Sequence, residues 1–227
     1  MANIFKNIIS LLYPPKCIFC GKLLNVKSEI DVCSSCFTEI PFLDGEAVIL
    51  PQTCNEGGCD RIICMCRYNG IVKASLLRYK FFNKSGYYRT FSKLLADRIK
   101  KMTDYREFDI IISVPLHKRK ENIRGYNQSF LISRAIGKQL GIRDGSELLL
   151  RVKNTCSQSL LPKKQRSVNI RGAFCVKRGI ELRGKKVLLI DDIMTTGYTL
   201  DECSRVLKEA GAKTVTAAII ASGRTWF

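Results

Sequence analysis

The sequence contains no apolar run that approaches the roughly 20 residues required for a membrane-spanning helix. Its apolar start is short, lacks a small-residue cleavage site and leads through Pro14-Pro15 into a cysteine motif. We therefore expect no signal peptide and a cytoplasmic protein, with a short amphipathic helix before the cysteines. The single histidine, His117, lies outside the cysteine-rich region, which argues against a catalytic zinc centre there.

Acidic residues are scarce, and their distribution is uneven. The chain has 38 Lys and Arg against 20 Asp and Glu, for a net charge of +18. Residues 1–66 carry a net charge of −2, whereas residues 67–227 carry +20. A polyanionic partner such as nucleic acid is therefore expected for the second region alone. A generally lysine-rich proteome would give the same total, because net charge by itself reports on solubility and non-specific binding.

Cysteine, by contrast, is abundant, and eight of the eleven cysteines lie between residues 17 and 66. In the first set, Cys17-x2-Cys20 and Cys33-x2-Cys36 form two CxxC pairs separated by twelve residues. Each pair holds two thiolates around one ion, and four thiolates complete a tetrahedral structural site with no open position for chemistry. Disulfides are the alternative, but they are rare in the cytosol. We predict structural Zn²⁺ at these four residues.

The second cysteine set has irregular spacing and comprises Cys54, Cys59, Cys64 and Cys66. Three interpretations stay open: a second four-thiolate site, extra ligands for the first site, or a set that includes a free thiol. A loop-rich segment of this length buries little core, so metal would supply folding energy. We assign residues 1–67 to a zinc-binding module with a structural or docking role, and residues 68–227 to a second domain.

The clearest feature of the second domain is an apolar strand, residues 187–190, followed by Asp191 and Asp192. A helical pattern that ends at Gly211 begins just beyond them. Backbone N–H groups at such a helix start hold phosphate, and the two carboxylates can accept hydrogen bonds from vicinal sugar hydroxyls. The sequence therefore predicts a phosphate–sugar site. Its turn consists of Thr195, Thr196, Gly197, Tyr198 and Thr199.

A second apolar strand, residues 109–114, leads into a basic loop, and a helix follows from about Asn127 to Leu140. The carboxyl end of a parallel strand is the usual ligand edge, so the cations there are candidates for polyphosphate binding. Residues 151–174 lack an apolar period, and we interpret them as a mobile lid, with an ordinary basic surface loop as the alternative. Loop candidates are Pro115, His117, Lys118, Arg119 and Arg124, and lid candidates are Gln158, Arg166, Asn169 and Arg171. We do not expect His117 to transfer protons.

Helical periodicity marks residues 71–80 and a second segment after Gly86, and an aromatic and basic run extends from the end of the first segment to the start of the second. Its cations are Arg78, Lys80, Lys84 and Arg89, and its aromatic residues are Tyr79, Phe81 and Phe82. Bases of single-stranded nucleic acid can stack on such rings. The alternative, that the rings pack into the core behind a solvated face, stays open.

At residues 187–199 the chain resembles the type I phosphoribosyltransferases, which bind 5-phosphoribosyl pyrophosphate (PRPP). The resemblance implies an α/β fold with a Rossmann-like parallel sheet and PRPP bound together with Mg²⁺. It further implies that Asp191 and Asp192 hold the ribose hydroxyls, that Thr195 to Thr199 surround the 5-phosphate, and that the basic loop binds pyrophosphate.

Over nearly its full length the chain resembles the ComF family of competence proteins, which join a zinc-binding head to a phosphoribosyltransferase domain. The motifs that carry the resemblance are the paired CxxC module, SVPLHKR, RGYNQS, the R-x2-N-x2-GAF pattern at residues 166–174 and IDDIMTTGYT. The resemblance implies a role in natural transformation, with single-stranded DNA and other competence proteins, including helicase-type ones, as partners. Cys64-x-Cys66 departs from the CxxC expected at the end of the second cysteine set.

The sequence leaves two candidate functions open. One is a DNA-handling protein that uses the PRPP fold as a sensor or an anion platform, which the +20 charge favours. The other is an active phosphoribosyltransferase of nucleotide metabolism, in which a nucleophile displaces pyrophosphate at C1 of the ribose. No base-specificity hood is recognisable, and the acceptor is not specified.

Overall fold

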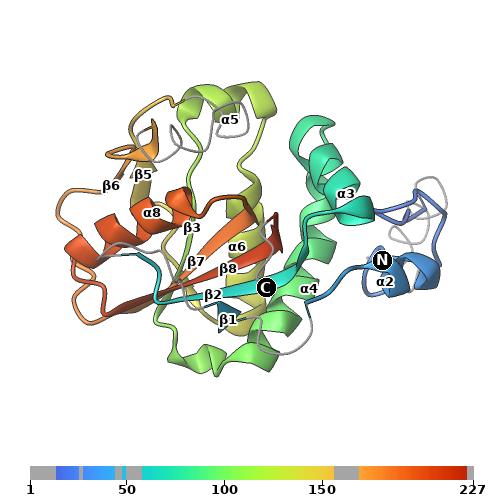
Figure 1. The fold of residues 1–227 in the computed structure, drawn as a ribbon, viewed down its shortest axis with the longest axis horizontal. Helices are drawn as coiled ribbons and strands as arrows, with labels where there is room; N and C mark the ends of the chain where they lie inside the picture. The colour runs from blue at the N-terminus through green and yellow to red at the C-terminus, as the bar shows by residue number, and fades with distance from the viewer. Residues whose placement is uncertain (1–13, 26–27, 44–47, 50–57, 156–168, 224–227) are drawn as a thin grey trace, which may run out of the picture.

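The protein is built around one sheet with helices on both faces (Figure 1). The computed structural model describes residues 14–25, 28–43, 48–49, 58–155 and 169–223. Within these residues the sheet has six strands, in the order β1 (Val48–Ile49), β2 (Arg61–Arg67), β8 (Thr214–Ser222), β7 (Lys186–Met194), β3 (Ile110–Ser113) and β4 (Arg143–Asp144). β1 pairs antiparallel with β2, and the other neighbours are parallel, as the sequence predicts for an α/β domain.

Two layers of helices cover this sheet (Figure 1). One face packs against α3 (Gly70–Phe81), α4 (Tyr88–Met102) and α6 (Gln128–Leu140). The other face packs against α8 (Tyr198–Glu209) and a hairpin of β5 (Leu149–Arg151) and β6 (Phe174–Val176). The short elements are α2 (Ser34–Glu39), α5 (Lys118–Arg124), η1 (Ser85–Tyr87) and η2 (Tyr105–Glu107). No helix within the described residues is long and apolar enough to cross a membrane.

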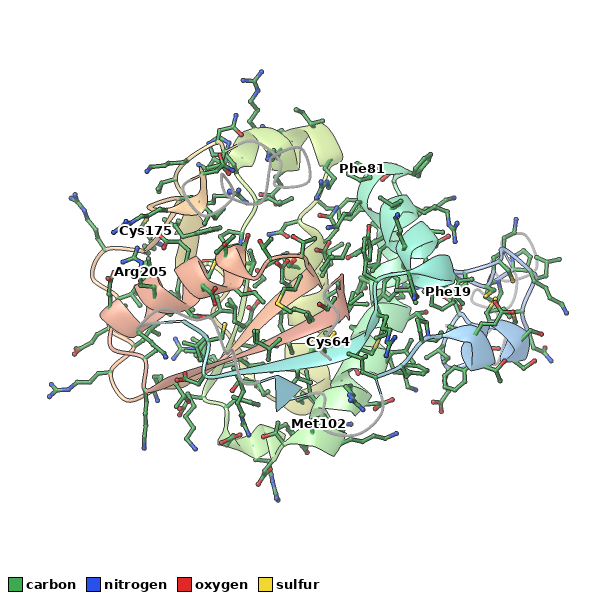
Figure 2. The ribbon with its side chains drawn as sticks, in the orientation of Figure 1. Phe19, Cys64, Phe81, Met102, Cys175 and Arg205 are labelled. Atoms are coloured by element: carbon green, nitrogen blue, oxygen red, sulfur yellow. The ribbon has the colours of Figure 1, made fainter. Side chains whose placement is uncertain are left out.

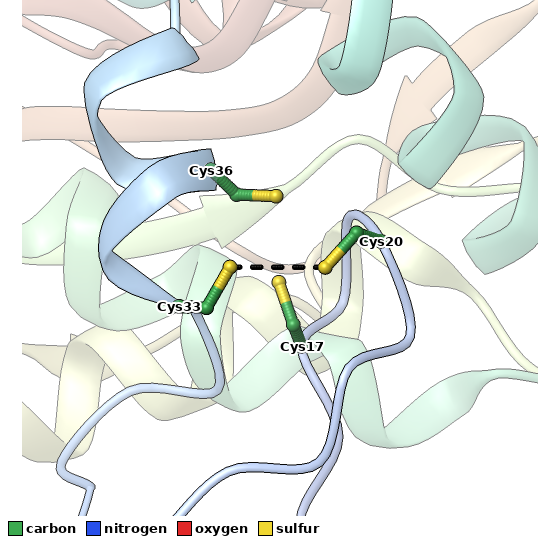
Figure 3. Close-up of side chains that lie close together, drawn as sticks. All are labelled: Cys17, Cys20, Cys33 and Cys36. Atoms are coloured by element: carbon green, nitrogen blue, oxygen red, sulfur yellow. Dashed lines mark hydrogen bonds between the residues drawn. The ribbon is translucent and has the colours of Figure 1, made fainter.

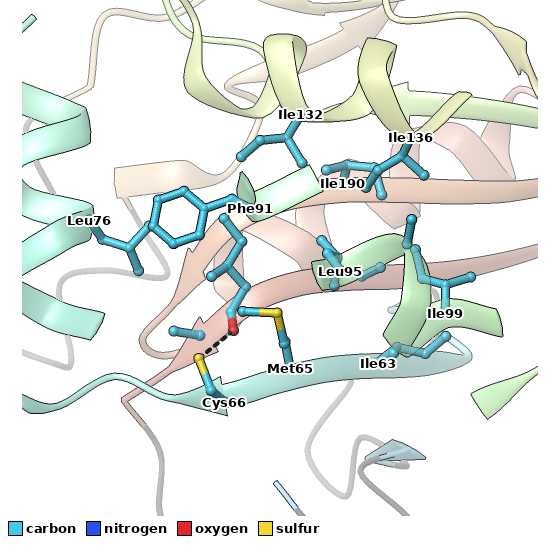
Figure 4. Packing of buried hydrophobic residues seen from close by; sticks show 14 of the residues in the cluster. Ile63, Met65, Cys66, Leu76, Phe91, Leu95, Ile99, Ile132, Ile136 and Ile190 are labelled. Atoms are coloured by element: carbon cyan, nitrogen blue, oxygen red, sulfur yellow. Dashed lines mark hydrogen bonds between the residues drawn. The ribbon is translucent and has the colours of Figure 1, made fainter. Parts of the chain in front are cut away.

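The alternation of side chains along β7 explains why the sheet has two cores. Leu188 and Ile190 enter the core beneath α4 and α6, whereas Val187 and Leu189 enter the core beneath α8. Figure 4 shows the first core, where residues of β2 and β7 meet Phe91, Leu95 and Ile99 of α4 and the isoleucines of α6. A strand buried on both faces reads as a continuous apolar run, which is how the sequence identified it.

The ends of α6 follow from local sequence. The Asn127 side chain accepts hydrogen bonds from the backbone N–H groups of Ser129 (3.0 Å) and Phe130 (3.4 Å), which caps the helix start. Gly141 ends the helix in the left-handed conformation at φ 69°. The predicted helix from about Asn127 to Leu140 is confirmed.

Strand β2 lies in the sheet, although the sequence assigned its residues to the cysteine module. Arg61–Arg67 pairs in register with β8 and has both faces buried. From the sequence, Cys64 and Cys66 of this strand were candidate metal ligands. In a strand, however, a buried cysteine behaves as a small apolar residue. The sheet therefore begins before residue 68, the first residue that the sequence assigned to the second domain.

Two further elements differ from the sequence prediction, and a third lies outside the main sheet. β7 continues past Ile190 to Met194 because Ile193 and Met194 still pair with β8. β6 pairs with β5 in a separate hairpin. The basic segment after Pro115 forms the helix α5 rather than a loop.

The cysteine module docks on α3 and shares its core. Arg78 donates hydrogen bonds to the carbonyl oxygens of Ile18 (2.9 Å) and Phe19 (2.7 Å), and Ser75 Oγ donates to Ile18 O (2.8 Å). Ile18 and Phe19 are buried in the same cluster as Phe91 of α4. The rings of Phe19 and Phe91 meet edge to face at 6.4 Å. The module and the sheet domain are thus packed as one body.

Candidate functional site

Asp191 and Asp192 lie near the carboxyl end of β7, where alternating strand geometry directs them to different partners. Asp191 Oδ1 accepts hydrogen bonds from Ser129 Oγ (2.8 Å), at the start of α6, and from the backbone N–H of Asp192 (2.9 Å). Asp192 is 6% exposed and forms an ion pair with Lys80 Nζ of α3 at 2.9 Å. Elements from three parts of the chain therefore hold this acidic pair.

The electrostatics of the pair favour a proton on one carboxylate. Burial, and next the negative charge of Asp192, raise the pKa of Asp191 to about 7. Lys80 and the Ser129 hydroxyl act in the opposite direction by stabilising the ionised form. Asp191 therefore changes its charge near neutral pH.

The turn after β7 leads directly into α8. Gly197 occupies the N-cap position at φ 90°, a left-handed conformation that side-chain-bearing residues rarely adopt. The twelve-residue helix α8 then presents the unpaired N–H groups of its first turn at the carboxyl edge of the sheet. Thr196 is buried, and its Oγ1 has no hydrogen-bond partner among the described residues. A phosphate-binding turn has these properties.

The acidic pair and this turn border one pocket of about 310 Å³. Asp191, Asp192, Thr195 and Thr199 line it together with residues of helices α3 and α5. The remaining lining residues are Tyr68, Leu77, Lys80, Phe81, Val114, Leu116, Lys120, Arg124, Gln128, Ser129, Arg151 and Ile193. The pocket thus combines carboxylates, hydroxyls and cations, the groups that a phosphorylated sugar requires.

The structure brings some of the predicted loop and lid residues to this pocket and not others. Arg124 lines it, and its Nη1 donates to Gln128 Oε1 at 2.6 Å. His117 instead caps α5, its Nδ1 accepting from the N–H of Arg119 at 3.3 Å. Five further candidates lie outside the lining: half-buried Pro115 and Asn169, and exposed Lys118, Arg119 and Arg171. Thr196, Gly197 and Tyr198 of the turn are also outside the lining, and Gln158 and Arg166 fall outside the described residues.

Several lining residues were not assigned to this site from the sequence. Lys80 was placed with a nucleic-acid surface, yet it pairs with Asp192. Lys120, in the same basic run as Lys118, lines the pocket and donates to the carbonyl oxygen of Thr155 at 2.8 Å. Arg151, which follows no recognisable motif, enters from β5. Each of these residues is a cation near the end of a helix or strand. The direction of its side chain depends on how that helix or strand packs against its neighbours.

The aromatic run divides between both sequence interpretations. Tyr79 is fully buried, and its hydroxyl donates to the carbonyl oxygen of Gln128 at 3.0 Å, so it belongs to the core. Phe81 and Phe82 are 63% and 67% exposed. Core packing therefore explains the first ring, and the other two remain available on the surface.

Figure 3 shows the four thiols of Cys17, Cys20, Cys33 and Cys36 converging from a loop and the start of α2. Their Sγ atoms all lie within 4.8 Å of one another, and those of Cys20 and Cys33 are 3.7 Å apart. Zn–S bonds of about 2.3 Å in a tetrahedron require S···S distances of about 3.8 Å, so the thiols fit a zinc ion.

The backbone of this knuckle also stabilises a thiolate. Burial opposes ionisation of the Cys17 thiol, but hydrogen bonds from the backbone at Cys20, Cys33 and Phe19 outweigh it and lower the pKa to about 7. Zinc binds thiolates rather than thiols. Burial, and next the neighbouring thiols, raise the pKa of Cys36, so the four thiols do not all ionise without a metal ion. The predicted structural zinc site therefore has suitable geometry and one thiol that ionises readily.

The second cysteine set does not converge in the described residues. Cys59 Sγ lies 2.8 Å from Ser204 Oγ, and Cys64 Sγ donates to Cys66 O at 3.4 Å. Cys66 Sγ donates to the carbonyl oxygen of Ile220 at 3.1 Å (Figure 4). Burial raises the pKa of Cys59 and of Cys64 to about 12, which disfavours thiolates. These three form no metal cluster with one another, and Cys54 falls outside the described residues.

Comparisons with known proteins agree with both parts of the chain. The phosphoribosyl transferase domain model matches residues 147–225, and the double zinc ribbon domain model matches residues 8–48. Competence protein F of Haemophilus influenzae is 31% identical over 216 residues, 88% of this chain and 93% of that protein. DNA utilization protein YhgH of Escherichia coli O6:H1 is 30% identical over 158 residues, 68% of this chain and 69% of that protein.

Among solved structures, glutamine PRPP amidotransferase from B. subtilis aligns with 63% of this chain and 30% of its own chain, at 19% identity and a TM-score of 0.42. The expected fold class is confirmed by the family models and the parallel sheet: a type I phosphoribosyltransferase fold with an N-terminal zinc ribbon. The zinc ribbon match contains the four clustered cysteines and ends before Cys54.

Proposed function

We propose a function for this chain from the premise that it belongs to the competence protein F (ComF) family. It binds PRPP together with Mg²⁺ in the pocket beside Asp191 and Asp192. It acts in DNA uptake during natural transformation by handling incoming single-stranded DNA. The names of two relatives, a competence protein and a DNA utilization protein, support this role.

The observation that carries the proposal is the single pocket that combines an acidic pair, a phosphate turn and basic helices. Asp191 and Asp192 accept hydrogen bonds from the ribose hydroxyls, and the turn from Thr195 to Thr199 surrounds the 5-phosphate. Magnesium bound together with PRPP would supply neutralisation of the diphosphate charge.

The proposed diphosphate-binding groups come from α5 and the segment after β5. Lys120 and Arg124 already line the pocket, and their positive charges suit a diphosphate. The other residues proposed for this task are Pro115, His117, Lys118, Arg119, Arg166 and Asn169. In this arrangement the cations of α5 stabilise negative charge beside the sugar, whether the diphosphate stays or leaves.

The DNA-binding part of the proposal rests on charge and exposure. The +20 charge of residues 67–227 exceeds what one PRPP molecule requires. Lys84, Lys118, Arg119 and Phe82 are exposed, and Phe82 directly follows Phe81 at the end of α3 (Figure 2). Such a combination of cations and rings suits a single strand, whose phosphates and bases both need partners.

The first test is a titration of the full chain with a labelled single-stranded oligonucleotide, with and without magnesium and PRPP. We expect binding that PRPP shifts, and a steep loss of affinity with salt. Contacts with about five phosphates would give a slope near −3.5 in log K against log salt concentration. Fluorescence anisotropy at several salt concentrations measures both effects.

A flat salt dependence would contradict phosphate-driven DNA binding. Tight PRPP binding without oligonucleotide binding would favour the second candidate, an active phosphoribosyltransferase. The intact acidic pair and turn support that candidate, in which a nucleophile forms a bond to C1 of the ribose as the C1–O bond to pyrophosphate breaks.

The pKa of Asp191 gives the proposal a pH dependence. The ionised carboxylate accepts hydrogen bonds from hydroxyls, so PRPP binding should release a proton and strengthen as the pH rises. With a pKa of about 7 and binding to the ionised form alone, affinity should increase about tenfold from pH 6 to pH 8.

Calorimetry in buffers of different ionisation enthalpy measures the affinity and the proton release. Inorganic pyrophosphate serves as the control, because it has the titrating phosphate oxygens and lacks the ribose hydroxyls. An equal pH dependence for PRPP and pyrophosphate would show that Asp191 is not the titrating group.

A further inference from the structure

The counter-ion of the acidic pair comes from outside the strand and turn that contain the pair. Asp192 is 6% exposed, and its Oδ1 lies 2.9 Å from Nζ of Lys80, a residue of α3. The Lys80 side chain is itself only 20% exposed. Burial of a charge without a partner is costly, so Lys80 compensates a negative charge that burial alone would disfavour.

The groups that face the pair from other elements have different contacts or no charge. From α6, Ser129 Oγ donates a hydrogen bond to Asp191 Oδ1 at 2.8 Å, and it is neutral. From β5, Arg151 lines the pocket, but its Nη2 donates to Thr155 Oγ1 and its guanidinium lies over the Phe174 ring. Burial raises the pKa of each remaining titratable group near the pair, so all are neutral at pH 7: Tyr68, Tyr79 and Cys203.

Two cations of α5 also line the pocket, and both contact groups other than the acidic pair. Lys120 Nζ donates to the carbonyl oxygen of Thr155 at 2.8 Å, and Arg124 Nη1 donates to Gln128 Oε1 at 2.6 Å. Lys80 is therefore the cation that the described residues place in direct contact with Asp192.

The ionisation of the pair decides how it can bind a sugar. An ionised carboxylate has two oxygens that only accept hydrogen bonds, whereas a protonated carboxyl group also donates one. Because two oxygens offer about four acceptor positions, Asp192 can bind Lys80 and a hydroxyl group at the same time. An opposite charge this close stabilises the ionised form, and Lys80 also acts on Asp191 in this direction.

We propose that Lys80 is a positioning residue of the sugar-hydroxyl site: it holds Asp192 in place and keeps both carboxylates available as acceptors. This role rests on the proposed PRPP function, because it concerns the hydroxyl groups that the pair would bind. Lys80 acts through the carboxylates and requires no contact with the ligand. The sequence had instead placed Lys80 on a nucleic-acid surface.

The test replaces Lys80 by methionine and measures PRPP affinity from pH 6 to pH 9 by calorimetry with magnesium. Loss of the cation should raise the pKa of Asp191 from about 7 to about 8. If PRPP binds the ionised form, affinity should be about fivefold weaker than that of wild type at pH 7 and within about twofold of it at pH 9. A loss of this kind is recovered by raising the pH, unlike a loss from altered packing.

Two further variants separate the charge at this position from other effects. Lys73→Met removes the same charge from an exposed position of α3 outside the pocket lining, so PRPP affinity should change less than twofold at every pH. Lys80→Arg keeps a cation beside Asp192 and should return the pH profile to that of wild type. Lys80→Gln, a polar replacement without charge, gives the same comparison where the methionine variant is unstable.

Inorganic pyrophosphate separates the proposed role from a direct contact with phosphate, because it lacks sugar hydroxyls. Its affinity should change less than twofold in Lys80→Met. An equal loss for PRPP and pyrophosphate would show that Lys80 binds phosphate itself. Tighter PRPP binding in Lys80→Met would show that Lys80 blocks the pocket. Either result would overturn the proposal.

The affinity of the wild-type protein for PRPP is measured first, so that two failures can be told apart. Absence of binding would overturn the proposed function, and the role of Lys80 with it. Binding by the wild type would leave that function standing, while a loss in Lys80→Met that persists at pH 9, or no loss at pH 7, would overturn the role of Lys80 alone. Thermal unfolding of each variant checks that the fold is intact.

Discussion

Replacement of both Asp191 and Asp192 by asparagine is expected to abolish PRPP binding while leaving zinc content and fold unchanged. A charge-assisted hydrogen bond contributes about 1.5–3 kcal/mol, so the loss of two should weaken PRPP affinity by at least about 100-fold. Asparagine keeps the shape of each side chain but removes the negative charge. Calorimetry with magnesium and PRPP measures the effect.

The fold should tolerate this change because of the electrostatics of the pair. Burial and the charge of Asp192 raise the pKa of Asp191 to about 7, so a neutral side chain is already populated there at neutral pH. Lys80 loses its ion-pair partner, but it is partly exposed and can turn toward water. Thermal unfolding and metal analysis check the fold and the zinc.

The matched control replaces Asp97 and Asp104 by asparagine, two exposed residues outside the pocket. It changes the net charge by the same amount, so it separates a local effect from a general electrostatic one. PRPP affinity within about threefold of wild type in the Asp191→Asn, Asp192→Asn variant would refute the site assignment.

Replacement of Cys17 by serine is expected to remove zinc from the protein and to destabilise the sheet domain as well. Structural zinc sites have apparent binding free energies of about 10–16 kcal/mol in small zinc-binding peptides, and a whole domain is stable by about 5–15 kcal/mol. The four thiols hold a module with little core of its own. Loss of the metal should therefore unfold the module.

The destabilisation should extend further because the module shares its core with the sheet domain. Ile18 and Phe19 directly follow Cys17, and their carbonyl oxygens accept hydrogen bonds from Arg78 and Ser75 of α3. Unfolding of the module would expose apolar surface of α3 and leave these donors without partners. We expect the unfolding temperature to fall by more than about 10 °C, since 1 kcal/mol corresponds to about 2–4 °C at this size.

Metal analysis and thermal unfolding, with and without a chelator, measure these changes. Cys64→Ala is the control, because the Cys64 thiol bonds the backbone of Cys66 and lies away from the four-thiol cluster. It should keep the wild-type zinc content. Equal zinc loss in Cys64→Ala, or full zinc content in Cys17→Ser, would contradict the assigned ligands.

Helix α3 connects the two sites that these substitutions probe. Ser75 and Arg78 hold the zinc knuckle, while Leu77, Lys80 and Phe81 line the pocket. The same helix therefore has two roles: it contacts the zinc knuckle and it lines the pocket. The sequence identified the helix but not these roles, because helical periodicity does not specify what each face contacts.

Several features of the protein were determined by the sequence itself. The CxxC spacing predicted that the four thiols converge, because each CxxC turn holds two thiolates around one ion and two such turns complete a tetrahedral site. The apolar run before Asp191 predicted β7, and Asn127 and Gly141 predicted the ends of α6. The resemblance to ComF proteins, on short motifs over most of the chain, led to the family that the comparisons support.

Tertiary structure decided the rest. In the sequence, Cys64 and Cys66 belong to a cysteine-rich segment that is typical of a metal site. In the structure they are core residues, because β2 pairs with β8 and is buried. Lys80 pairs with Asp192 and Arg151 lines the same pocket, although both residues lie far from the acidic pair in sequence. Local sequence patterns therefore predict where motifs lie and where helices and strands end. The contacts of a cation or a thiol depend instead on which helices and strands pack together in the core.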